Sequence, residues 1–157
     1  MTEQESPLNT PLVLTQVVLQ PQLDEASQEC DLGVLLRLAD DAAFMASIRY
    51  CRGQKVFTAQ MADFEVDAVV RCQDLVRCAA RVIATGTRSI LVETILTVSR
   101  LPYICEEPLG RGEFVTVLTE ADYSPLHVPL LSTMTDAARE RLAFLKRASA
   151  DELLLPE

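Results

Sequence analysis

The chain has 157 residues, of which 49% are hydrophobic and 24% charged, a balance typical of one globular domain. Its formal net charge of −9 argues against a broad nucleic-acid or anionic-membrane surface, because phosphates are bound by basic patches. The N-terminal segment MTEQESPLNT lacks the layout of a secretion signal, and the apolar run PLVLTQVVLQ is too short to span a bilayer. We therefore expect a cytoplasmic protein that binds neither nucleic acid nor membrane.

In chain order, the sequence first predicts a tail, a strand and a long helix. Residues 1–10 are polar and are predicted to be a disordered tail. Residues 12–20 are rich in β-branched side chains and predict a strand, and a loop over 21–32 follows. The apolar stretch from about 33 to 50 predicts a buried helix that ends just before Gly53.

After the helix, apolar residues alternate with a period of two, which is typical of strands. The predicted strands are 57–66, 75–83, 90–98 and 114–120. In the first of them the apolar phase slips between Met61 and Phe64, which indicates a β-bulge. Residues 85–89 contain a glycine and predict a hairpin. Residues 101–113 hold two prolines and two glycines, so we expect an irregular excursion there.

The segment TMTDAARERLAFLKR, residues 133–147, predicts an amphipathic surface helix capped by Ser132 or Thr135. An antiparallel sheet of about five strands needs an apolar element against one face, and the helix at 33–50 fits that position. The sequence thus predicts an α+β hot-dog fold, in which the sheet wraps around a long central helix. We expect the domain to span 11–148 and to be followed by a flexible tail over 149–157.

The five cysteines form no C-x-x-C pair, and an odd number without a signal peptide favours reduced, mostly buried thiols. Cys72 and Cys78 are predicted to be strand packing. The single histidine, His127, is predicted to be structural, and with scattered cysteines it argues against a zinc site. No G-x-S-x-G motif occurs, so a serine triad is not expected either.

Two adjacent acids, Asp40 and Asp41, lie in the middle of the apolar helix. Arg37 is placed to pair with either of them. Because this helix has no broad polar face, at least one acid must be buried or line a cleft, where acids are functional candidates. Gly33 is on the same face as Asp40, about 10.5 Å away along the helix axis. A single small carbonyl cannot contact both the amides at the helix start and Asp40, so we expect a partner subunit to complete the site.

Several segments resemble hot-dog-fold acyl-CoA thioesterases of the bacterial and cytosolic acyl-CoA hydrolase type. The helix segment GVLLRLADDAAFMAS carries a glycine followed seven residues later by an acid, as the family's signature does. The other similar segments are VFTAQMADFEV (56–66), QD (73–74), GTRS (86–89) and residues 113–147. The resemblance extends over about 11–148 and implies hydrolysis of acyl-CoA to a free acid and CoA, a reaction of lipid metabolism.

The resemblance implies a catalytic set that works without a covalent serine. Asp40 takes the role of the acid, either as a general base on water or as a nucleophile. The backbone amides of Leu32 and Gly33 take the role of the oxyanion hole. Glu65 is at a second-strand position where many members have Asn or Asp.

The resemblance also implies how the substrate is bound. Arg88 and Ser89 match the hairpin that approaches CoA, and an arginine suits phosphate. Glu29 is at the position of a family asparagine, and Asp41 is expected to pair with Arg37 or to cap the cleft. CoA is part of the substrate, so no separate cofactor is expected. A homo-oligomer is implied: a dimer, a tetramer or a hexamer.

The chain departs from the family immediately before the helix. It reads ECDLG where members often have His-Gly-Gly, so Asp31 takes the histidine position and Leu32 that of the first glycine. An acid at 31 repels a developing oxyanion unless its side chain points away. The alternative is therefore a non-catalytic hot-dog protein that binds acyl-CoA or serves as an assembly subunit. Pairing of both Asp40 and Asp41 with Arg37, away from any cleft, would favour that alternative.

A third possibility is a thioesterase that acts on acyl-carrier protein. Carrier proteins are usually acidic, so this chain's own negative charge disfavours docking to one.

Overall fold

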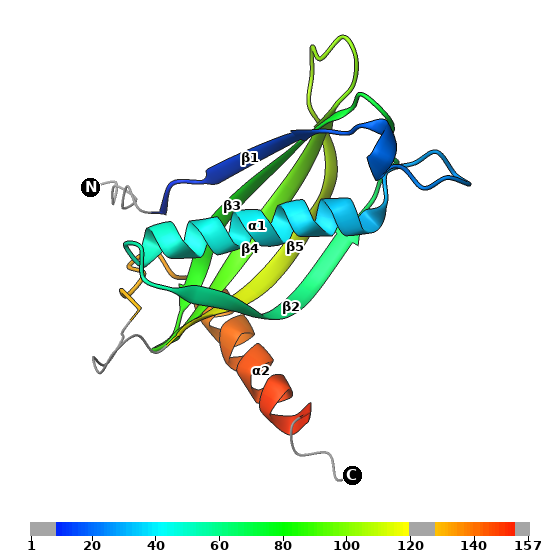
Figure 1. Cartoon of the computed structure of the whole chain (residues 1–157). Helices are drawn as coiled ribbons and strands as arrows, with labels where there is room; N and C mark the ends of the chain where they lie inside the picture. The colour runs from blue at the N-terminus through cyan, green and yellow to red at the C-terminus, as the bar shows by residue number, and fades with distance from the viewer. Residues whose placement is uncertain (1–8, 120–127, 153–157) are drawn as a thin grey trace.

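The computed structural model describes residues 9–119 and 128–152, which form one antiparallel sheet and two long helices (Figure 1). The elements are β1 (Leu12–Val17), the 3-10 turn η2 (Gln20–Gln22), α1 (Leu32–Tyr50), β2 (Val56–Val66), β3 (Leu75–Thr85), β4 (Ser89–Ser99), β5 (Glu107–Leu118) and α2 (Asp136–Glu152). None of the helices in this part of the chain has the length and apolarity that crossing a bilayer requires.

The sheet has the strand order β1-β3-β4-β5-β2, and all neighbouring strands are antiparallel. Figure 1 shows α1 lying lengthwise along one face of the curved sheet. Small side chains let the helix lie close to the strands; the buried alanines of α1 are Ala39, Ala42, Ala43 and Ala46. They share one apolar core with inward residues of β3 and β4 such as Val76, Val82, Val92 and Leu96. The predicted α+β hot-dog fold is confirmed.

The second helix covers part of the opposite face of the sheet. Its buried residues Ala138, Leu142 and Leu145 pack against Ala84, Leu91 and Val115 in a separate, smaller core. Thr135 starts this helix, since its hydroxyl oxygen accepts the Ala138 amide at 3.2 Å. The helix is therefore peripheral, as the amphipathic pattern predicted, but it continues to Glu152, beyond the predicted domain end at 148.

The strand β5 begins at Glu107, so the prediction of an irregular segment over 101–113 is wrong for its second half. The prediction failed because Gly110 and Gly112 lie inside the strand rather than in a loop. A Cβ atom on Gly110 would overlap the carbonyl oxygen of Glu65 on β2, so glycine here permits close approach of two strands. The bulge predicted after Met61 is confirmed by a shift in the pairing of β2 with β5.

The predicted N-terminal tail includes Asn9, which is nevertheless buried. Its side-chain amide donates to the carbonyl of Val82 at 3.1 Å, and its oxygen accepts the Val82 amide at 3.0 Å. Asn9 thus extends the hydrogen bonding along β3 before the first residue of β1. Residues 1–8, and the predicted structural histidine His127, lie outside the described part of the chain.

All five cysteines are free thiols: Cys30 is half-buried, and the other four are either buried or exposed. Cys51 and Cys78 are buried, and burial raises the pKa of Cys51 to about 11 and that of Cys78 to about 12, so both stay protonated. Cys72 and Cys105 are exposed, which corrects the prediction of mostly buried thiols and of Cys72 as strand packing. Cys72 lies in the turn before β3, where no neighbouring strand covers it.

Candidate active site

A cavity of about 680 Å³ lies between α1 and the edge of the sheet formed by β5 and β2. The described residues that line it are Gly33, Leu36, Arg37, Asp40, Asp41, Thr58, Met61 and Phe114. Apolar side chains therefore adjoin one end of α1 and its two central acids. A pocket in which apolar side chains stand beside convergent polar groups is the usual form of a small-molecule site.

Asp40 is half-buried in this cavity and is held by a side chain from the neighbouring strand. The Thr58 hydroxyl donates to Asp40 Oδ1 at 2.7 Å. This bond fixes one carboxylate oxygen and leaves the other available to a proton or a carbonyl carbon. Thr58 was not among the residues predicted for the site. Its signal was the alternation of β2, which puts Thr58 on the same face as the buried Val56.

Asp41 is in a different environment from Asp40. It forms an ion pair with Arg37, whose Nε lies 3.9 Å from Asp41 Oδ2; the Asp41 side chain is 58% exposed and that of Arg37 84%. Such an exposed pair contributes little to stability. Arg37 therefore pairs with Asp41, while Asp40 lines a cleft. A non-catalytic protein would be favoured by pairing of both acids with Arg37 away from any cleft, and the structure does not have that arrangement.

The start of α1 is closed by its own capping residue. Asp31 is the N-cap, and its Oδ1 accepts the Gly33 amide at 2.8 Å. The Leu32 amide makes no hydrogen bond with the described residues, and the Leu32 side chain is 55% exposed outside the cavity lining. Of the two amides predicted to form an oxyanion hole, the one that lines the cavity is thus already bound to a carboxylate.

Glu65, the other predicted catalytic residue, does not join Asp40. Its neighbours Phe64 and Val66 pack into the core under α1, so Glu65 projects from the opposite face of the sheet. There it forms an ion pair with Arg111 at 3.7 Å. The bulge lies before Phe64 and does not turn Glu65 inward. Its placement does not support a catalytic role in this chain's own cavity.

The residues predicted to bind substrate are dispersed in the single chain. Glu29 is exposed in the loop before α1 and is not among the cavity residues. Arg88 is exposed in the β3–β4 hairpin, where its Nη2 donates to the Leu118 carbonyl at 3.1 Å. Ser89 is buried beside it, and its hydroxyl has no hydrogen-bond partner among the described residues. Only Asp41 of this set shares the cavity with Asp40.

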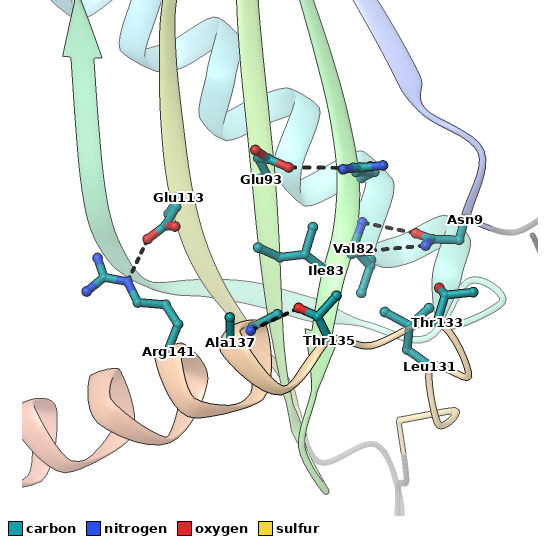
Figure 2. A pocket seen from close by; sticks show the side chains of 12 residues that line it. Asn9, Val82, Ile83, Glu93, Glu113, Leu131, Thr133, Thr135, Ala137 and Arg141 are labelled. Atoms are coloured by element: carbon teal, nitrogen blue, oxygen red, sulfur yellow. Dashed lines mark hydrogen bonds and ion pairs between the residues drawn. The ribbon is translucent and has the colours of Figure 1, made fainter.

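A second cavity, of about 490 Å³, lies on the other face of the sheet where α2 meets β3 and β4 (Figure 2). Two ion pairs cross it: Arg81 with Glu93 at 3.5 Å, and Arg141 with Glu113 at 2.9 Å. Asn9, at the edge of this cavity, forms two hydrogen bonds through its side-chain amide to the backbone of Val82. The charges in this cavity balance one another, so it offers a weaker basis for chemistry than the Asp40 cavity.

This arrangement of a curved antiparallel sheet wrapped along a long helix defines the class of hot-dog proteins. A model of the Thioesterase superfamily matches residues 32–99, which run from the first residue of α1 to the last of β4. The resemblance to hot-dog thioesterases that the motifs indicated is thereby confirmed over this segment. A comparison with curated protein sequences gave no match.

Solved structures of acyl-CoA thioesterases share the whole fold at low sequence identity. An apo-hexameric acyl-CoA thioesterase superposes with a TM-score of 0.76 at 17% identity, covering 93% of this chain and 94% of its own. The acyl-CoA hydrolase of Bacillus cereus gives 0.75 at 22% identity, with 94% and 95% covered. That of Staphylococcus aureus, solved with butyryl coenzyme A and coenzyme A, gives 0.75 at 16% identity, with 91% and 88% covered.

Proposed function

We propose that the protein hydrolyses acyl-CoA thioesters and that Asp40 is its catalytic acid. The observation that carries the proposal is the Asp40 carboxylate, half-buried in a cavity of a hot-dog fold and held by Thr58 at 2.7 Å. The similarity to acyl-CoA hydrolases supports the substrate class. A partly buried acid held by a neutral hydroxyl is costly relative to an exposed one, which favours a functional reason for its position.

In the proposed reaction, one Asp40 oxygen takes a proton from water as the water oxygen attacks the thioester carbonyl carbon. The carbonyl oxygen becomes an oxyanion, which amides at the start of α1 stabilise. When it collapses, the carbon–sulfur bond breaks, the CoA thiolate takes up a proton and the carboxylic acid leaves. In the other route, Asp40 attacks the carbon itself, the carbon–sulfur bond breaks with loss of the CoA thiolate, and water then hydrolyses the resulting anhydride. Hydrolysis in ¹⁸O-labelled water, limited to one turnover, detects the anhydride route, because water that attacks the Asp40 carbon of the anhydride leaves ¹⁸O in Asp40 and general-base hydrolysis does not.

The site is proposed to lie at an interface between two copies of the chain. The cavity opens beside β2, an edge strand of the sheet whose outer side has no partner strand among the described residues. Phe57 and Met61 on this strand are each 49% exposed. Exposed apolar side chains on an unpaired edge favour association, and two of the similar structures are described as hexameric.

Substrate binding at Arg88, Ser89, Asp41 and Glu29 remains part of this proposal. Arg88 would approach the CoA phosphates from a second subunit, since within one chain it does not line the Asp40 cavity. We also propose a cytoplasmic location, in which the exposed thiols of Cys72 and Cys105 stay reduced.

A second candidate function is binding of acyl-CoA without turnover. The contact between Asp31 and the Gly33 amide favours it, because an occupied donor cannot polarise a thioester oxygen. A panel of short, long and aromatic acyl-CoAs tests both candidates by release of free thiol. The hydrolase proposal expects turnover of at least one of them. Saturable binding with no thiol release from any member would favour the second candidate.

Association should be coupled to activity if a partner subunit completes the site. We expect specific activity to fall on dilution over the same range of protein concentration in which the oligomer dissociates. Analytical sedimentation measures the dissociation. Phe57→Lys, which places a charge at the β2 edge outside the Asp40 cavity, should shift both transitions to higher protein concentration. Lys55→Ala, at an exposed position before the same strand, is the control. Activity per chain that stays constant while the oligomer dissociates would contradict a shared site.

Replacing Thr58 by valine removes its hydroxyl and keeps its shape. We expect kcat/KM to fall by about tenfold or more, chiefly through kcat, because a hydrogen bond to a charged group contributes about 1.5–3 kcal/mol. Thr58→Ser retains a hydroxyl and should restore most of the rate. Equal rates for the valine and wild-type proteins would show that Thr58 does not position Asp40.

A further inference from the structure

We infer that Asp31 sets the rate of the proposed reaction by competing with the substrate oxygen for the Gly33 amide. This inference rests on the proposed thioester hydrolysis and names a residue that the reaction itself does not use. Asp31 is thus a positioning residue that acts through the Gly33 amide. Its carboxylate must leave this amide before an oxyanion can form there, and that requirement slows the reaction.

The geometry that supports this inference is a single short contact at the mouth of the cavity. Asp31 Oδ1 lies 2.8 Å from the Gly33 nitrogen, and Gly33 lines the same cavity as Asp40. The backbone of Asp31 is held at both ends: its amide donates to the Gln22 carbonyl at 2.9 Å, and its carbonyl accepts the Val34 amide at 3.0 Å. The side chain is exposed, so it can rotate away while the helix start stays in place.

In this contact the Asp31 carboxylate occupies the Gly33 amide in the way that the oxyanion of the reaction intermediate would. A carboxylate oxygen and a tetrahedral oxyanion present the same charged acceptor to an N–H donor. One N–H group cannot serve both at full strength. A carboxylate that remained nearby would also repel the developing negative charge. Asp31 therefore stabilises the resting enzyme and opposes the transition state.

An ordinary helix cap and a competing carboxylate make opposite predictions when Asp31 is changed. Loss of an ordinary cap lowers stability and leaves activity equal or lower. Loss of a competitor lowers stability and raises kcat, because the Gly33 amide becomes available only to the oxyanion. The gain should appear in kcat rather than in KM, since the oxyanion develops in the transition state.

The experiment compares Asp31→Ala, Asp31→Asn and wild type in kcat, KM and thermal midpoint. We expect Asp31→Ala to lower the midpoint and raise kcat by about tenfold. Asparagine caps helices as well as aspartate does but accepts through a neutral oxygen. Asp31→Asn should therefore keep the midpoint and raise kcat by about threefold, which tests the inference even if the alanine variant is poorly folded.

Asp24→Ala is the matched control in the same loop. Asp24 Oδ1 accepts the amides of Ala26 and Ser27 at 3.1 and 2.9 Å, so its loss disturbs the loop but not the Gly33 amide. Its kcat should equal that of wild type. If the wild-type protein turns over and neither Asp31 variant raises kcat, this inference is overturned and the hydrolase proposal stands. If no variant releases thiol from any acyl-CoA, both are overturned.

Discussion

Asp40→Asn is expected to lower kcat for thioester hydrolysis by about 10³-fold, because general-base catalysis contributes roughly 10²–10⁴. The substitution preserves size and shape, and its amide oxygen can still accept the Thr58 hydroxyl. The fold and the cavity should therefore persist, and acyl-CoA binding should remain. Release of CoA thiol from the best substrate of the panel measures the loss, and an unchanged thermal midpoint shows that folding is intact.

Asp41→Asn is the matched control for the acid one residue away. Asp41 is exposed and pairs with Arg37, so we expect a loss of no more than about threefold, mainly in KM. An Asp40→Asn protein that hydrolysed acyl-CoA at the wild-type rate would remove Asp40 from the mechanism. In that case Glu65→Gln would show whether the acid on β2 acts instead, from a neighbouring subunit.

Gly110→Ala is expected to destabilise the fold by about 3 kcal/mol, near the upper end of the usual cost of overpacking. An added Cβ would overlap the Glu65 carbonyl oxygen and lie 3.0 Å from Val66 Cα and 3.2 Å from the Glu65 carbonyl carbon. These are backbone atoms in a paired strand, so no side-chain rotation relieves the overlap. The pairing of β5 with β2 must open locally. Denaturant unfolding measures the change in free energy.

Gly53→Ala is the control that separates steric overlap from backbone strain. Gly53 has φ +85° and nothing within 4 Å of an added Cβ, so only the left-handed conformation opposes a side chain there. The expected cost is about 1 kcal/mol. A Gly110→Ala protein no less stable than Gly53→Ala would show that the strands separate there without strain.

The candidate site combines features that local sequence patterns predict with contacts between residues far apart in the chain. The alternation along β2 predicted a strand and a bulge, yet the partner of Asp40 is 18 residues away along the chain and on another element. The resemblance implied a catalytic role for Glu65 from its position on the second strand, whereas strand parity turns its side chain to the face of the sheet opposite α1. The charged end of Asp31 was expected either to repel an oxyanion or to point away. It instead binds the amide that the oxyanion needs.

By itself, the sequence determined the order of the elements, the buried helix and the presence of two acids within it. These follow from periodicity and local chemistry, which act over a few residues. The tertiary structure decided which of the two acids Thr58 holds, which amide is occupied, and that two glycines belong to β5 rather than to a loop. Such choices depend on how closely β2, β5 and α1 approach one another, and that approach is set by packing between residues far apart in the chain.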